Sequence, residues 1–196
     1  MLNDLSSPLA LLRTRRSGRP RDLGEPGPSG DELQQIVSVA ARTPDHGKLA
    51  PWRFIHVPRD RRDELQRLLE SAYRVGNPAP GRLELEAIEK FAQQAPTLIV
   101  VLFTPVQPSK IPLWEQQLSC GAAVMNLELA AHAMGYAAGW VTGWAADSEP
   151  VLEAFGGRIG DRIAGFIYIG TPLLPLEERV RPDRNIVFRD WEGLGE

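Results

Sequence analysis

The chain has 196 residues, of which 43% are hydrophobic, a size that suits one domain with its own core rather than two. The net charge of −3 gives no general attraction to nucleic-acid phosphates or anionic membranes. The longest apolar run, Leu98 to Phe103, is too short to cross a bilayer, and the N-terminus does not resemble a signal peptide. We therefore expect a cytoplasmic protein without nucleic-acid or membrane partners. The single cysteine, Cys120, excludes an internal disulfide.

Capping signals and hydrophobic periodicity place the secondary structure along the chain. Ser29, followed three residues later by Glu32, forms a capping box that opens a helix. The run Thr97 to Phe103 is apolar throughout, which indicates a central strand covered on both faces. The predicted elements are, in order, helices at 8–16 and 29–42, a strand at 52–57, helices at 60–74 and 82–94, a strand at 97–103, a helix at 114–134, strands at 137–142 and 163–169, and between these two a short helix at 149–155.

Two segments carry expectations about packing. The helix 114–134 has two apolar stripes, which predicts burial on two faces. One stripe is Leu118, Ala122, Met125 and Leu129, and the other is Val124, Leu127, Ala131 and Met134. The extension 177–196 is charged, is interrupted by Pro182 and has little of its own to bury, so we expect it to pack on another subunit. The whole chain, 1–196, then forms a single α+β domain, with helices flanking a sheet.

The first candidate for binding chemistry is the segment Arg15, Arg16 and Ser17 at the end of the first helix. Guanidinium groups bind phosphate through paired hydrogen bonds, and a neighbouring hydroxyl can add another. The alternative is a solvated basic helix end, where positive side chains meet the negative end of the helix dipole.

Two further segments carry polar groups suited to a ligand. Arg42 lies at a helix end and His46 on the turn that follows, so both could meet polar edges of a ligand; a capped helix end with an exposed histidine is the alternative. Trp140, Val141 and Thr142 end a strand, where backbone amides and an indole could meet a planar ring. A strand end with a packed tryptophan is the alternative there.

Other chemistries lack the residues they need. The three histidines, His46, His56 and His132, do not have metal-ligand spacing, so no metal site is expected. The glycines from Gly156 to Gly160 follow a short helix rather than a strand, which argues against a Rossmann dinucleotide site. The sequence has no nucleophile elbow and no P-loop. Cys120 lies in the predicted buried helix and is expected to be structural.

The motifs described above, taken in order, resemble the nitroreductase family, and within it a small YdjA-like subgroup. The resemblance runs from about Leu5 to Pro182. It also includes Pro51–Phe54, Trp114–Gln116 and Gly165–Pro172. It implies a mixed central sheet flanked by helices, an intertwined homodimer, bound FMN, and NADH or NADPH as co-substrate.

The resemblance also implies which residues bind the cofactor. It assigns Arg15, Arg16 and Ser17 to the flavin phosphate and the polar edge of the isoalloxazine. Arg42 and His46 match positions that contact FMN from the opposite subunit, and Trp140 to Thr142 match a further stretch at the flavin. At Val141 the subgroup pattern has arginine, so this chain lacks one positive partner. The stretch Ala130–Gly135 matches one sometimes assigned to nicotinamide, but core packing explains it better.

The implied activity is ping-pong reduction of a small-molecule oxidant, such as a nitro-aromatic or quinone-like compound. Hydride passes from the nicotinamide to flavin N5 and then to the oxidant, so the cofactor and not a side chain carries the chemistry. No catalytic residue is assigned, and holding FMN is the role expected for His46. Dehalogenation, flavin fragmentation, or a non-catalytic flavin-binding dimer are alternatives with the same fold.

Overall fold

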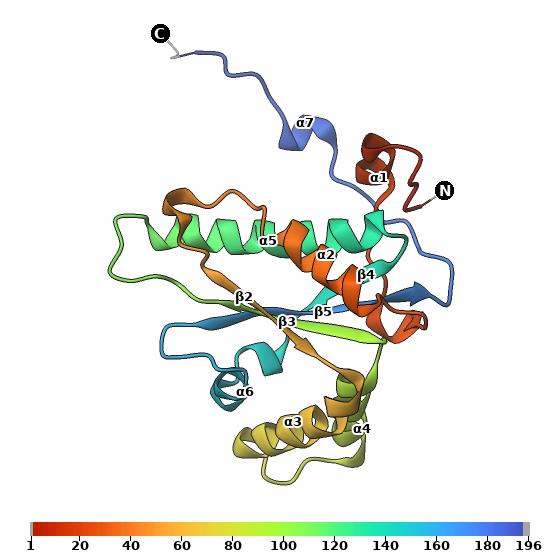
Figure 1. Ribbon diagram of the computed structural model, residues 1–196, viewed down its shortest axis with the longest axis vertical. Helices are drawn as coiled ribbons and strands as arrows, with labels where there is room; N and C mark the ends of the chain where they lie inside the picture. Colours follow the sequence, from red (N-terminus) through yellow and green to blue (C-terminus); the bar gives the residue numbers. More distant parts are fainter. Residues whose placement is uncertain (1, 194–196) are drawn as a thin grey trace.

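A computed structural model describes residues 2–193, which form three layers with a sheet in the middle (Figure 1). Helices α2 and α5 cover one face of the sheet, and α3, α4 and α6 cover the other. The helices are α1 (Pro8–Thr14), α2 (Gly30–Ala40), α3 (Arg62–Gly76), α4 (Arg82–Gln93), α5 (Leu113–Ala133), α6 (Glu149–Ala154) and α7 (Arg184–Val187). The strands are β1 (Leu23–Gly24), β2 (Trp52–Val57), β3 (Thr97–Phe103), β4 (Ala137–Val141) and β5 (Arg162–Pro172).

The sheet is built around β5 and β3. The strand order is β1, β5, β3, β2, and β4 also pairs with β5. All of these pairings are antiparallel, so the expectation of a mixed sheet is wrong for the strands that the structure describes. Every strand that pairs with β5 or β3 runs in the opposite direction to it. The α+β class and the interior position of β3 are confirmed.

Alternate side chains of β3 supply the cores on the two faces of the sheet. Leu98, Val100 and Leu102 pack in the cluster that includes α3 and α4. Ile99, Val101 and Phe103 pack in the cluster that includes α2 and α5. Successive side chains of a strand point to opposite faces, so a strand covered on both sides must be apolar at every position. This explains the uninterrupted apolar run in the sequence.

Most predicted elements are present, with small shifts at their ends. The capping box is formed: the Ser29 hydroxyl accepts from the Glu32 amide, and the Glu32 carboxylate accepts from the Ser29 amide. The first helix ends at Thr14 and not at Arg16, because the backbone of Arg15 turns to an extended conformation. Strand β5 is longer than predicted, since its C-terminal end pairs with β1.

The prediction that α5 is buried on two faces is wrong within one chain. The stripe with Val124, Leu127 and Ala131 is fully buried against the sheet. The other stripe is only partly covered: Leu118 is 54% exposed and Ala122 is exposed, whereas Met125 and Leu129 are half-buried. The surface of α5 around Leu118 and Ala122 is therefore apolar and open in the described part of the chain.

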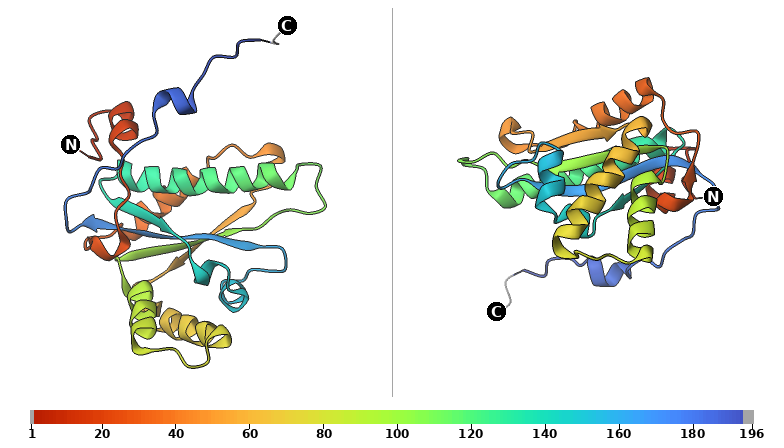
Figure 2. Two further views of the ribbon diagram at one scale, coloured as in Figure 1. Left: turned by 180° about the vertical axis from the view of Figure 1, so that it is seen from behind. Right: turned by 90° about the horizontal axis from the view of Figure 1, so that it is seen from below.

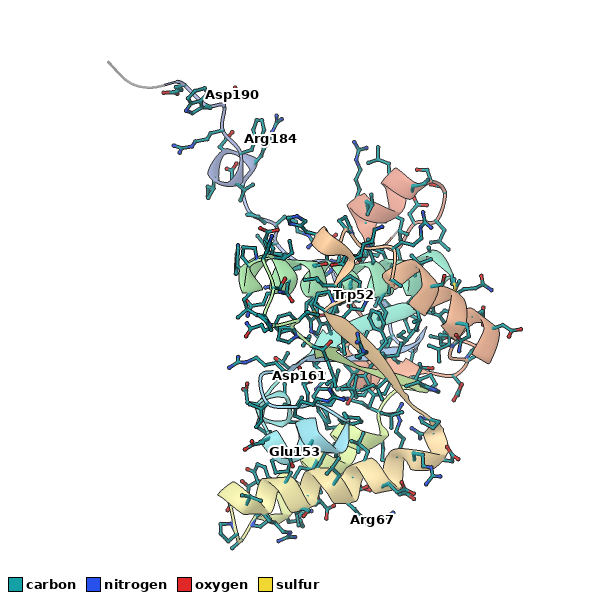
Figure 3. The ribbon with its side chains drawn as sticks, turned by 60° about the vertical axis from the view of Figure 1, so that its left-hand side comes forward. Trp52, Arg67, Glu153, Asp161, Arg184 and Asp190 are labelled. Carbon is teal, nitrogen blue, oxygen red and sulfur yellow. The ribbon has the colours of Figure 1, made fainter. Side chains whose placement is uncertain are left out.

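The C-terminal extension leaves the body of the molecule (Figure 1). Figure 3 shows Arg184 and Asp190 on this extension, beyond the end of the helical layer. Residues 177–193 are almost entirely exposed, and residues 194–196 of the predicted extension lie outside the described part. Among residues 2–193, no helix is long and apolar enough to cross a membrane.

Candidate functional site

The basic segment after α1 lies against strand β4. The backbone amide of Gly18 donates to the carbonyl of Ala138 at 2.9 Å. A Cβ atom on Gly139 would collide with the Gly18 carbonyl oxygen, so glycine is required where the two backbones meet. This contact brings Arg15, Arg16 and Ser17 close to β4, the strand that ends in the candidate segment Trp140 to Thr142. Two of the three sequence candidates therefore come together.

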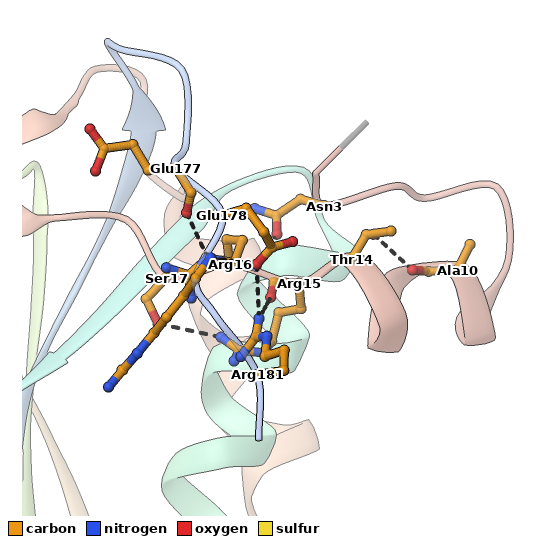
Figure 4. Close-up of polar contacts among 10 residues, drawn as sticks. Asn3, Ala10, Thr14, Arg15, Arg16, Ser17, Glu177, Glu178 and Arg181 are labelled. Atoms are coloured by element: carbon orange, nitrogen blue, oxygen red, sulfur yellow. Dashed lines mark hydrogen bonds and ion pairs between the residues drawn. The ribbon is translucent and has the colours of Figure 1, made fainter. Parts of the chain in front are cut away.

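The two arginines of this segment have different partners (Figure 4). Arg15 donates to the Ser17 hydroxyl at 3.3 Å. Arg16 donates through Nε to the Glu177 carbonyl at 2.7 Å and lies 3.5 Å from the Glu178 carboxylate. The C-terminal extension thus already engages part of the Arg16 guanidinium, which the sequence did not indicate.

A cavity of about 290 Å³ lies beside this basic segment. It is bounded on one side by residues 16–19 and 22–23, and on the other by residues 174–179. Arg16, Ser17 and Arg19 provide guanidinium and hydroxyl donors on its wall, and such donors suit an anionic ligand. Glu177 and Glu178 lie on the opposite side of the cavity, so an anion would compete with carboxylates of the chain itself.

The end of β4 presents one exposed tryptophan. The Trp140 indole donates to the Ala164 carbonyl at 2.9 Å and packs over Gly165, where a Cβ atom would collide with the ring. Its side chain is still 41% exposed. Val141 packs against the core on the α3 side, while Thr142 is exposed. The indole N–H is therefore used within the chain, and only the free surface of the ring and the strand end remain for a ligand.

The turn that carries Arg42 and His46 is fastened to α5 by polar side chains. His46 Nδ1 lies 2.8 Å from the Glu115 carboxylate. The Ser119 hydroxyl donates to the Pro44 carbonyl at 2.7 Å, and the Asn126 amide donates to the Thr43 hydroxyl at 2.7 Å. These three residues share one face of α5, since their spacings of four and seven residues return to the same side of a helix. They set the position of this turn.

Within one chain, the basic segment and this turn lie on opposite sides of α5. The charge of Arg15 influences the pKa of Glu128, so the basic segment lies on the side of α5 that carries Glu128. Thr43, in contrast, is hydrogen-bonded to Asn126. Residues two positions apart in a helix are rotated by roughly 200° around its axis, so Glu128 and Asn126 face opposite directions. His46 is further displaced, since Glu115 and Glu128 are roughly 20 Å apart along the helix. One chain therefore does not bring all the candidate residues to one ligand.

The sequence comparison decides the family. The model of the nitroreductase family matches residues 12–171. The chain belongs to the nitroreductase family. This confirms the resemblance drawn from the ordered motifs.

Two relatives extend the match over most of the chain. The Escherichia coli (strain K12) protein provisionally named NAD(P)H nitroreductase YdjA is 39% identical over 169 residues, covering 85% of this chain and 88% of the relative. A Haemophilus influenzae protein, also provisionally named NAD(P)H nitroreductase, is 37% identical over 175 residues, covering 88% of this chain and 92% of the relative.

Solved structures of the nitroreductase family share the fold. A nitroreductase-like family protein from Bacillus cereus has a TM-score of 0.80 at 21% identity and covers 96% of this chain and 97% of its own. A nitroreductase from Desulfovibrio desulfuricans, solved in complex with FMN, has a TM-score of 0.71 at 21% identity, with 94% and 98% covered. At these identities the similarity supports the three-layer fold alone.

The structure also identifies residues of this nitroreductase-family chain that sequence reasoning missed. Glu115 is the partner of His46, and the polar stripe with Ser119 and Asn126 on an otherwise apolar helix was a readable signal for it. Glu128 and His132 are buried beside the basic segment, at 4% and 0% exposure. Their spacing of four residues puts them on one helix face, but only the tertiary structure placed that face next to Arg15.

Proposed function

We propose that this chain is an FMN-dependent oxidoreductase that uses NADH or NADPH and works as a homodimer. Its relatives named NAD(P)H nitroreductase support the co-substrate. Fold relatives support the cofactor: one was solved with FMN, and an NADPH:FMN oxidoreductase from Vibrio harveyi was solved with NAD⁺. The proposed second substrate is a small oxidant such as a nitro-aromatic or quinone-like compound.

The observation that carries this proposal is the contact between the basic segment and β4. The Gly18 to Ala138 hydrogen bond holds the segment with two guanidinium groups and a hydroxyl against the buried start of β4, the strand that ends at the exposed Trp140 and Thr142. A phosphate needs the first set of groups, and the edge of a flat ring can use strand-end amides. Both halves of a flavin mononucleotide thus find suitable partners at adjoining places.

The residues present fit FMN in kind. Arg15 and Ser17 would hold the phosphate, and Arg16 would add to it to the extent that Glu177 and Glu178 release its guanidinium. Trp140 and Thr142 would meet the ring, whereas Val141 provides only its backbone. Bound FMN would supply hydride transfer between NAD(P)H and the oxidant through its N5 position. The arginines would favour negative charge on the ligand, because cations placed where charge develops stabilise it.

The homodimer is proposed because one chain does not complete this site. Arg42 and His46 lie across α5 from Arg15, so they would serve a flavin held by a second copy. The uncovered apolar stripe of α5 gives that copy a surface to bury, since exposed apolar patches of this kind mark interfaces. The apolar side chains of the extension, Ile186, Val187, Phe188 and Trp191, are 55% to 83% exposed, and we propose that they pack on the partner.

The first experiment is the visible spectrum of the purified protein. We expect a yellow protein with FMN released on denaturation, and bleaching when NADH or NADPH is added without oxygen. The oxidant class is then tested by restoring the colour with a nitro-aromatic or a quinone. A colourless protein that remains colourless with excess FMN would contradict the proposal.

The shared site is tested by mixing two defective variants. Arg15→Ala and His46→Ala should each bind FMN weakly as homodimers. In a mixed dimer, one of the two sites takes Arg15 from the His46→Ala chain and His46 from the Arg15→Ala chain, and is intact. Random exchange of subunits should restore tight binding at about a quarter of all sites. No restoration after verified exchange would place both residues at one site of a single chain, against the proposal.

A further inference from the structure

The first residues of the C-terminal extension lie against the basic segment of the same chain (Figure 4). Arg16 donates through Nε to the Glu177 carbonyl at 2.7 Å, and the Glu178 carboxylate lies 3.5 Å from the same nitrogen. Arg19 donates to the Glu177 carboxylate at 2.5 Å. Two consecutive acidic residues thus engage two of the guanidinium groups that line the cavity of about 290 Å³.

A guanidinium of the extension adds to this arrangement. Arg181 donates to the Arg15 carbonyl at 3.3 Å and lies 3.4 Å from the Glu178 carboxylate. The backbone amide of Arg179 donates to the same carboxylate at 2.7 Å. We call residues 177–181 the covering segment. Its contacts fix the Glu178 carboxylate beside Arg16.

The covering segment is held by polar contacts, whereas the chain just before it is held by apolar packing. Leu176 packs against the core cluster that includes α3 and α4, but every residue of the covering segment is exposed. Its one apolar side chain, Val180, is 94% exposed. Ion pairs between exposed side chains are individually weak. A competing anion can therefore displace the covering segment without disturbing the packed core.

An anionic ligand needs the same donors that the covering segment uses. The guanidinium of Arg16 binds a phosphate through paired N–H groups, and its Nε–H is already given to Glu177. Glu178 also supplies a negative charge where the ligand would bring its own. When a ligand and a segment exclude each other, each weakens the binding of the other by the same factor. A bound phosphate must then loosen the covering segment.

We propose that residues 177–181 are an autoinhibitory element, in which Glu177 and Glu178 occupy the arginines of the anion site until the phosphate of a flavin displaces them. Displacement frees the start of the extension, and the apolar residues 186–188 follow directly along the chain. Cofactor loading thereby controls the release of the extension from its own chain toward the partner. This inference rests on the proposed FMN site, but it concerns carboxylates that leave the site.

The first test is the FMN affinity of apoprotein, measured by fluorescence titration. Glu177→Gln and Glu178→Gln keep the size of the side chain and remove its charge, so each weakens the covering segment. Because exposed ion pairs are weak, we expect the dissociation constant for FMN to fall by about 2- to 5-fold in each variant.

The control for these variants is Asp183→Asn. Asp183 belongs to the same extension and accepts from the Asn185 amide at the start of α7, and asparagine caps a helix as well as aspartate does. This change removes one charge of the extension outside the covering segment, so FMN affinity should stay close to that of the wild type. Equal tightening by Asp183→Asn would show a general charge effect and would overturn the inference.

The second test follows the covering segment itself. A nitroxide spin label on Val180→Cys reports the motion of this segment, and the native Cys120 does not interfere because it is 2% exposed. We expect the spectrum to sharpen when FMN is added, since the segment is released. In the Glu177→Gln and Glu178→Gln double variant, the label should be mobile before FMN is added. A label on Leu83→Cys, at a position of α4 that is 71% exposed, should not respond.

The outcomes separate this inference from the proposed function. Tight FMN binding with wild-type affinity in both glutamine variants would overturn the autoinhibitory role and leave the flavin site intact. A Val180→Cys label that keeps its mobility when FMN binds would do the same, because the segment would then stay in place. Failure of the wild type and of both variants to bind FMN would overturn both proposals.

Discussion

The Gly18 carbonyl faces the Cα of Gly139 so closely that no side chain fits between them. This contact joins the segment after α1 to β4 and creates the candidate site. Gly139→Ala should separate the two backbones and cost about 1–3 kcal/mol of stability, with a loss of FMN content. The measurement is chemical denaturation together with the flavin to protein ratio.

The control for this change is Gly30→Ala. Gly30 begins α2 and has open space where a Cβ would stand, so alanine should leave both stability and flavin content nearly unchanged. Equal behaviour of the two variants would mean that the close approach of Gly18 and Gly139 is not needed.

The arginines are tested through flavin affinity. Removing a charged hydrogen-bond donor to phosphate costs about 1.5–3 kcal/mol, so Arg15→Ala should weaken FMN binding by about 10- to 100-fold. Arg16→Ala should weaken it as well. Arg13→Ala, an exposed change in the last turn of α1, is the control. Fluorescence titration of apoprotein with FMN gives the affinities, and normal binding by both Arg15→Ala and Arg16→Ala would show that the phosphate site is elsewhere.

The outer stripe of α5 is tested through the oligomeric state. Leu118 is 54% exposed in a single chain, and we expect Leu118→Asp to produce monomers, because a buried unpaired charge is strongly unfavourable at an interface. FMN should be lost at the same time, since each flavin would need residues from both copies. Light scattering after gel filtration measures the mass. Leu83→Asp, at a position that is 71% exposed on α4, should remain dimeric.

Arg62 is expected to be structural. It is fully buried and donates to the carbonyls of Val57 at 3.0 Å and Ala92 at 2.9 Å, which joins the end of β2 to α4. Burial lowers its pKa to about 10, so it is still charged at pH 7. Arg62→Met should cost about 3 kcal/mol or more, because buried carbonyls lose their donor. Arg67→Met, exposed on the same helix (Figure 3), should cost little.

Cys120 is expected to be unreactive in the folded protein. It is 2% exposed, and burial raises its pKa to about 12, so almost no thiolate forms at pH 8. A thiol reagent such as DTNB should label the chain only after denaturation. Rapid labelling of the native protein would contradict the packing of α5 on the sheet.

The sequence was sufficient for the local structure. The Ser29 and Glu32 capping box and the uniformly apolar β3 follow from interactions between near neighbours and from strand periodicity. Strand β2 was equally readable. The ordered motifs were also sufficient to identify the family, because the order of a set of short patterns is far more specific than any one of them.

The arrangement of the candidate residues depended on the tertiary structure. Nothing in the chain's local pattern says that Arg16 meets Glu177 and Glu178, or that α5 separates Arg15 from His46. The apolar stripe at Leu118 predicted burial, yet Leu118 is 54% exposed in the described part of the chain. By itself, the sequence determined most of the helices and strands, and its resemblance to the family proposed which groups bind a flavin. Which of these groups share a side of α5, and which groups of the C-terminal extension meet Arg16, were decided only by long-range packing, because such contacts join residues that no periodicity relates.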